Sequence, residues 1–203
     1  MNKIWVIGLG PGHPDYMLPI AKRKLLQAKR VYGGKRHLET YNMKGDKVQI
    51  KIPLFETIED IKSNYRLNQT AVLVSGDTGF YSFLEMLKEH FSEDELETYP
   101  GISSLQYLFS KLNMSYHNAY IGSVHGRAID DEEFRNYNIM GLLTDKKQGP
   151  KELMDKLRKL DLSATLFIGE NLSYSTEKIT AIHTSEEIER TYSSLCVVVI
   201  KFD

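Results

Sequence analysis

The sequence predicts an α/β protein built from two α/β domains, with a parallel sheet in the N-terminal domain and a mixed sheet in the C-terminal domain. Strand candidates such as IWVIG and AVLV are apolar at every position, which is typical of parallel strands covered on both faces. Segments with helical spacing alternate with these strands up to about residue 112, and this alternation favours a parallel sheet. Beyond that point the alternation breaks down, so we expect a domain boundary there.

The first domain is expected to span residues 1–113. Its expected strands lie at 4–10, 30–34, 48–54, 70–77 and 96–99, and its expected helices at 19–29, 57–66, 81–91 and 103–113.

The second domain is expected to span residues 114–203. Its expected strands lie at 118–124, 138–145 and 164–170, with a helix at 150–160 and a closing strand, turn and strand over 178–202.

Composition excludes several classes of protein. The 203 residues carry 26 Lys and Arg against 27 Asp and Glu, so charge gives no reason to expect a nucleic acid or an anionic membrane as partner. Cys196 is the single cysteine, and the six histidines are scattered, so neither a disulfide framework nor a protein-held metal is expected. No signal-peptide pattern or membrane-length apolar run occurs, and a cytoplasmic location is expected.

The stretch GLGPGHPD after the first strand invites comparison with a dinucleotide-binding loop. That fingerprint needs a third glycine at its sixth position, where this chain has His13. Pro11 also lacks the amide hydrogen that a pyrophosphate would bind. A nicotinamide-dependent oxidoreductase is therefore disfavoured, although it stays an alternative.

Two further glycine-rich turns, SGDTGFYS and YPGISS, follow later strands of the same domain. The carboxyl ends of parallel strands meet at one edge of a sheet, where such proteins bind ligands. The three turns together predict a pocket at this edge.

In this order and spacing, GLGPG, SGDTGFYS and PGISS resemble the tetrapyrrole (corrin/porphyrin) methylase family. GGKRHLE, SVHGR, LLTDKKQGP and GENLSYSTEKI resemble its branch that methylates C-5 of cobalt-precorrin-7 or the equivalent precorrin. The resemblance implies a homodimer that holds S-adenosyl-L-methionine in a cleft between the two domains. It also implies a polycarboxylate corrinoid precursor as substrate. Some relatives carry a fused C-15 methyltransferase and decarboxylase, which here would be a separate protein.

The resemblance also implies which residues form the cofactor site. Asp77 could equally be a turn residue that binds its own backbone, and Ser103 or Ser104 could be a helix cap. The cofactor-binding candidates are Leu9, Gly10, Gly76, Asp77, Phe80, Ser103, Ser104, Leu143, Thr144 and Asn171.

A substrate fringed with carboxylates needs cations in the site. Lys35, Arg36, His125 and Arg127 are the substrate-binding candidates, whereas Lys146 and Lys147 are expected in a solvated loop. No catalytic residue is assigned, and His125 is the one candidate proton acceptor, with an ordinary hydrogen-bonded histidine as its alternative. Other functions left open are methylation of another tetrapyrrole position, of a modified histidine in a translation factor or of ribosomal RNA ribose. A non-catalytic protein that binds S-adenosylmethionine is a further alternative.

Overall fold

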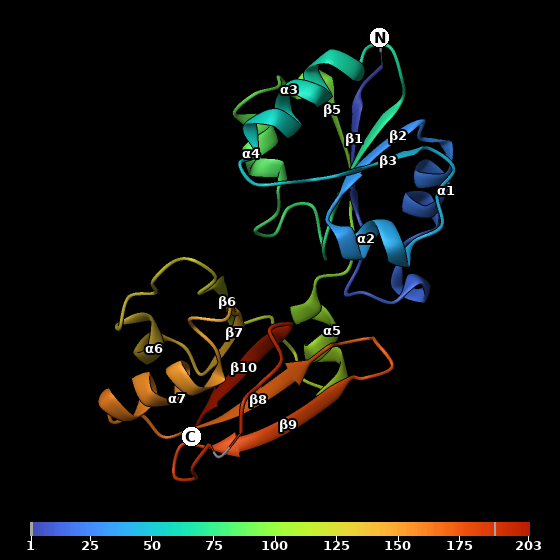
Figure 1. The fold of residues 1–203 in the computed structure, drawn as a ribbon. Helices are drawn as coiled ribbons and strands as arrows, with labels where there is room; N and C mark the ends of the chain where they lie inside the picture. The colour runs from blue at the N-terminus through green and yellow to red at the C-terminus, as the bar shows by residue number, and fades with distance from the viewer. Residues whose placement is uncertain (1, 189) are drawn as a thin grey trace. The chain divides into compact units, whose positions relative to one another are not determined.

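The structure is a computed structural model that describes residues 2–188 and 190–203. The chain divides into two compact units, and the boundary along the sequence lies between Ser103 and Ser104 (Figure 1). Each unit contains one five-stranded sheet, parallel in the first unit and mixed in the second. The predicted fold class of two α/β domains is confirmed.

The first sheet has the strand order β3-β2-β4-β1-β5, and every neighbouring pair is parallel. Its strands are β1 (Ile4–Gly8), β2 (Arg30–Gly33), β3 (Asp46–Gln49), β4 (Thr70–Val74) and β5 (Leu96–Tyr99).

Helices cover both faces of this sheet, which is why the residues of β1, and those of β4 after Thr70, are apolar. In β1, Trp5 and Ile7 pack with α1 (Pro19–Gln27) and α2 (Lys35–Thr40) on one face. Ile4 and Val6 pack with α3 (Phe55–Asn64) and α4 (Leu84–Lys88) on the other, and Figure 1 shows the two helix layers. Two short 3₁₀ turns, Pro14–Tyr16 and Glu93–Glu95, complete the unit.

The second sheet has the order β6-β7-β10-β8-β9, with β6 parallel to β7 and the other pairs antiparallel. Its strands are β6 (Tyr120–Ser123), β7 (Ile139–Leu143), β8 (Ala164–Glu170), β9 (Lys178–His183) and β10 (Cys196–Phe202). The helices α6 (Glu133–Asn136) and α7 (Pro150–Lys159) pack on one face. Helix α5 (Ser104–Lys111) covers β7 and β10.

The boundary between the units lies ten residues before the one expected from sequence, because α5 packs with the second sheet. Phe109 lies directly over Gly141, where a Cβ atom would come within 2.8 Å of its ring. Leu108 lies over Gly169 in the same way, at 3.1 Å. The apolar face of α5 is thus shaped to glycines of β7 and β8.

Two short helices were not predicted. The six residues of α2 and the four of α6 are too few to show a helical period. Helix α4 is shorter than expected because Tyr81 has a left-handed backbone, with φ of 48°, so the helix begins only at Leu84. Among the described residues, no helix is both long and apolar enough to cross a membrane.

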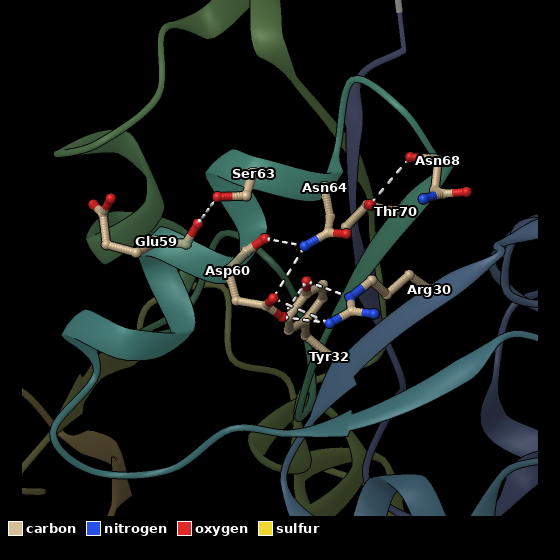
Figure 2. Close-up of polar contacts among 8 residues, drawn as sticks. All are labelled: Arg30, Tyr32, Glu59, Asp60, Ser63, Asn64, Asn68 and Thr70. Carbon is tan, nitrogen blue, oxygen red and sulfur yellow. Dashed lines mark hydrogen bonds and ion pairs between the residues drawn. The ribbon is translucent and has the colours of Figure 1, made fainter.

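A polar cluster fastens α3 to the start of β2 (Figure 2). The Arg30 guanidinium donates to both carboxylate oxygens of Asp60, at 2.8 and 3.1 Å, and to the Tyr32 hydroxyl at 2.8 Å. Tyr32 donates to Asp60 at 2.7 Å, and the Asn64 amide donates to the same carboxylate at 3.0 Å. Burial opposes the charge of Asp60, but these hydrogen bonds outweigh it and lower the pKa of its carboxyl.

Replacing Asp60 by Asn should lower the free energy of unfolding at pH 7 by about 1–2 kcal/mol. This loss is smaller than for a fully buried ion pair, because solvent screens the partly exposed Asp60–Arg30 pair. A carboxyl whose folded-state pKa is lowered stabilises above its unfolded value, about 4, and this stabilisation is lost as pH falls through the folded value. The gap between wild type and Asp60→Asn, measured by urea unfolding, should therefore shrink below about pH 4. Glu59→Gln, on the same helix, is the control, because the Glu59 carboxylate forms an exposed pair with Lys62, and this substitution should change stability little.

Candidate functional site

The loops that follow β1, β4 and β5 meet at the carboxyl edge of the first sheet. These strands are neighbours in the sheet, so the loops at 9–12, 75–80 and 100–103 emerge side by side. We call these three loops the three-loop edge. Gly10 and Gly76 exchange both of their backbone hydrogen bonds, with N···O distances of 3.1 and 2.9 Å. The expectation that the glycine-rich turns share one edge is confirmed.

Gly101 stands where no side chain fits. A Cβ atom on this residue would lie 2.1 Å from the carbonyl oxygen of Gly76 and 2.9 Å from the carbonyl carbon of Gly8. Both neighbours are backbone atoms of sheet-bound loops, so neither can swing aside as a flexible side chain would. The three loops therefore touch backbone to backbone, which makes the edge rigid.

Asp77 joins two of the loops through its carboxylate. One oxygen accepts from the amide of Gly79 in its own turn, at 2.8 Å, and the other accepts from the amide of Gly101 at 3.0 Å. The turn-residue interpretation of Asp77 is thus correct as far as it goes, and the bond to Gly101 adds a contact between loops. Contact with a cofactor is not excluded by these bonds, because a carboxylate has about four acceptor positions.

The three-loop edge has a distinct charge. Across residues 9–12, 75–80 and 100–103, Asp77 is the one ionisable side chain, and neither Lys nor Arg occurs. Beside Asp77 a pyrophosphate would meet a negative charge, and these loops themselves supply no cation to balance it, whereas a ligand with a positive centre beside Asp77 is favoured. The edge therefore suits a cationic ligand better than a dinucleotide.

Two side chains from the α2 region support this edge, and neither was among the predicted cofactor-binding residues. The Tyr41 hydroxyl is buried and lies 2.9 Å from the carbonyl oxygens of both Leu9 and Gly12. His37 contacts the first residue of the second loop, with Nε2 2.8 Å from Ser75 Oγ. The motif GGKRHLE was interpreted through its cations as part of a substrate site, but nothing in the sequence indicated that Tyr41 faces the first loop.

The other predicted residues of the first unit lie around this edge in different settings. Phe80 packs against the ring of Tyr81, with centroids 4.8 Å apart. Ser103 is buried beside Gly76, and Ser104 is the first residue of α5. Lys35 is exposed on α2, and Arg36 next to it is half-buried.

In the second unit, Leu143 ends β7 and is followed by Thr144 and Asp145. The Thr144 hydroxyl is buried and donates to the carbonyl of Cys196 at 2.7 Å, so it ties β7 to β10. The Asp145 carboxylate accepts from the amides of Gln148, Gly126 and Lys147, each at 2.7 Å. These hydrogen bonds lower the pKa of Asp145 and draw the SVHGR and TDKKQG loops together.

His125 and Arg127 belong to this pair of loops. His125 is exposed, and its backbone amide donates to Ser123 Oγ at 3.1 Å. The Arg127 carbonyl accepts from the side-chain amide of Gln148 at 2.9 Å. Their backbones are fixed, and both side chains lie at the surface of the second unit.

Asn171 follows β8 and adopts a left-handed backbone, with φ of 47°, which is uncommon outside glycine. Its backbone N–H donates to the Leu195 carbonyl at 2.9 Å, and its side-chain Oδ1 accepts from Ser193 Oγ at 2.8 Å. No hydrogen bond of its side-chain Nδ2 occurs within residues 2–188 and 190–203. Asn171 therefore has two donor hydrogens to offer a ligand.

Glu170 anchors the segment that holds Asn171. This buried carboxylate accepts from the Arg190 guanidinium at 2.6 and 3.2 Å and from the amide of Ser193 at 2.9 Å. Burial opposes its charge, but these bonds outweigh that effect and lower the pKa of Glu170. Arg190 also lies 4.1 Å from the centroid of the Tyr192 ring.

A hollow of about 320 Å³ lies beside this segment, next to the beginning of α7. Its lining includes Asp145, Lys146, Pro150, Lys151, Glu152, Arg190, Thr191, Tyr192, Ser193 and Ser194. Among the described residues, no three His, Cys, Asp or Glu side chains gather in a way that could hold a metal ion.

Comparison with known proteins identifies the family. The family Tetrapyrrole (Corrin/Porphyrin) Methylases matches residues 3–189. The chain belongs to this family, and it is a methyltransferase. The cobalt-precorrin-7 C(5)-methyltransferase of Salmonella typhimurium is 29% identical over 197 residues, covering 96% of this chain and 97% of the relative.

Solved structures of family members share the fold. The precorrin-6Y methylase of cobalamin biosynthesis from Archaeoglobus fulgidus superposes with a TM-score of 0.77 at 22% identity, over 99% of this chain and 98% of that one. A uroporphyrin-III C-methyl transferase from Thermus thermophilus, complexed with S-adenyl homocysteine, superposes with a TM-score of 0.72 at 17% identity, over 98% and 92%.

The crowding at Gly101 gives a prediction about this methyltransferase. Gly101→Ala should destabilise the protein by about 3 kcal/mol or more, or prevent soluble expression, because the new methyl group overlaps backbone atoms. Gly126→Ala is the matched control: it has φ of 66° but nothing within 4 Å of the added Cβ, so it should cost only about 1 kcal/mol of backbone strain. Equal thermal midpoints for the two variants would contradict the rigid edge.

Proposed function

We propose that the protein transfers a methyl group from S-adenosyl-L-methionine to C-5 of cobalt-precorrin-7, or of the equivalent precorrin, in cobalamin biosynthesis. The full-length similarity to a cobalt-precorrin-7 C(5)-methyltransferase supports this substrate. So do the GGKRHLE and SVHGR motifs, which resemble that branch of the family.

The charge of the three-loop edge carries the cofactor assignment. S-adenosylmethionine would supply an electrophilic methyl group on a positively charged sulfonium. Asp77, unaccompanied by Lys or Arg within the edge, offers the opposite charge. Leu9, Gly10 and Gly76 would offer backbone carbonyl oxygens, because their N–H groups already donate to other backbone carbonyls, with Phe80, Ser103 and Ser104 beside them.

In the second unit, Asn171 Nδ2 would bind an acceptor of the adenosine. Thr144 would act through its backbone, since its hydroxyl already donates to Cys196, and Leu143 would supply apolar contact. The rigid loops suit this reaction, because aligning the methyl group with the attacking carbon can contribute about 7–11 kcal/mol.

The acidic macrocycle would be bound by Lys35, Arg36 and Arg127, with His125 as a further polar contact. Guanidinium groups suit carboxylates because they form paired hydrogen bonds. No catalytic base is assigned to His125, because its side chain is exposed. We also propose that the protein acts as a homodimer and that a separate protein carries out the chemistry at C-15.

Methyl transfer from labelled cofactor to cobalt-precorrin-7 tests this function directly. A singly methylated product with the label at C-5 is the expected result. Calorimetric titration should show binding of S-adenosylhomocysteine and not of NADH or NADPH. Cofactor binding without a corrinoid product would point to another substrate of the family, and nicotinamide binding would overturn the cofactor assignment.

The role of Asp77 in binding the cofactor's positive charge can be separated from its role in holding the loops together. Asp77→Asn keeps the side chain's size but removes its charge, so affinity for cationic S-adenosylmethionine should fall about fivefold more than affinity for neutral S-adenosylhomocysteine, a difference of roughly 1 kcal/mol. Both affinities can be measured by calorimetry on the same preparation. An equal loss for the two ligands would show that Asp77 acts only through loop structure.

A further inference from the structure

His37 and Ser75 form a contact that the proposed site does not use. His37 lies on α2, and Ser75 is the exposed residue that directly follows β4 and begins the second loop of the three-loop edge. Nε2 of His37 is 2.8 Å from Ser75 Oγ. The other ring nitrogen, Nδ1, is fully buried and has no hydrogen-bond partner in the described part of the chain.

The imidazole of His37 is neutral at physiological pH. Burial, together with the nearby Arg36 guanidinium, lowers the pKa of His37 to about 4. A neutral imidazole carries one N–H, which lies either on the buried Nδ1 or on Nε2. An orphaned buried N–H is rarer than an orphaned acceptor, and a lone pair rather than an N–H is favoured near the Arg36 cation. The hydrogen is therefore assigned to Nε2, which donates to Ser75.

This assignment fixes what Ser75 can do. Its oxygen accepts from His37, so its own hydroxyl hydrogen remains to be donated. No other hydrogen bond of the Ser75 side chain is found among residues 2–188 and 190–203, and the residue is exposed. An oxygen that already accepts a hydrogen bond is also a stronger donor, because chains of hydrogen bonds polarise one another.

We propose that Ser75 donates a hydrogen bond to a carboxylate of a bound ligand, and that His37 is the positioning residue that orients this hydroxyl. The proposal rests on the proposed function and deepens it. A carboxylate is the acceptor because the guanidinium of Arg36, whose charge acts on the neighbouring His37 ring, favours an anion there. That carboxylate belongs either to the amino-acid part of the cofactor or to an acidic arm of the macrocycle.

The test uses four variants of the full chain. Ser75→Ala removes the donor, and His37→Phe removes the group that orients it. His37→Gln places an amide N–H near the position of Nε2 and should rescue the loss. Ser63→Ala is the matched control, since the exposed Ser63 hydroxyl donates to the Glu59 carbonyl of its own helix, outside the three-loop edge. Thermal midpoints within about 3 °C of wild type confirm that each variant folds.

Two measurements distinguish the sources of the carboxylate. If it belongs to the cofactor, Ser75→Ala and His37→Phe weaken S-adenosylhomocysteine binding about tenfold, as expected for a hydrogen bond to a charged group. The same ligand without its carboxylate should then bind wild type and variants alike. If it belongs to the macrocycle, cofactor affinity is unchanged and KM for the corrinoid rises about tenfold.

Unchanged affinity for both ligands in Ser75→Ala would overturn the proposal. So would His37→Gln behaving like His37→Phe, since the orienting role would then be absent. A wild-type protein that binds S-adenosylhomocysteine but does not methylate the corrinoid would contradict the proposed function instead. In that case the affinity for S-adenosylhomocysteine alone decides the role of Ser75. An unchanged affinity in Ser75→Ala would then contradict the proposal.

Discussion

The close approach of three backbone segments at the carboxyl edge of the first sheet is the constraint on which the candidate site depends. The amide of Gly101, the carbonyl of Gly76 and the chain at Gly8 lie so near one another that any side chain at Gly101 would overlap backbone. A parallel sheet makes this approach possible, because β4, β1 and β5 deliver their loops to the same side. A binding edge made of backbone has few torsions left to fix when a ligand arrives, so less binding energy is lost in ordering it.

Holding the loops in this position requires polar groups behind them. Tyr41 reaches two carbonyls of the first loop, and His37 reaches the first residue of the second. Both come from the short helix α2 or the residue after it, so the neighbouring strand β2 contributes to the edge through its helix. Loss of packing under α2 would therefore displace the loops, even though α2 lies outside the sequence motifs that follow β1, β4 and β5.

The sequence predicted what depends on repeated local patterns. Most apolar strands and long helices, and the glycine-rich turns, follow from spacing and residue type, and the structure confirms them. The strand expected at 48–54 is instead the short, mostly exposed β3 (Asp46–Gln49), and the helix expected at 81–91 is only α4 (Leu84–Lys88). Tyr41 and His37 could not be assigned to the edge, because their roles depend on contacts with segments about 30 and 38 residues away. The short helices α2 and α6 lack a readable period, and the place of α5 depends on glycines in β7 and β8 that only the packed structure brings together. The ligands of the site residues stay predictions.

In both units an acidic residue that follows a strand accepts hydrogen bonds from several loop amides. This structural role affects how the loss of activity in a variant of that residue is interpreted. Asp77 gathers the amides of Gly79 and Gly101, and Asp145 gathers those of Gly126, Lys147 and Gln148. A carboxylate in such a position is a strong acceptor for several amides at once, and so it organises loops whether or not a ligand is bound. Loss of activity on replacing either residue would not by itself assign a role in the reaction, since the loop geometry changes too. Only a measurement that responds to the charge of the ligand, and not merely to its presence, separates the two roles.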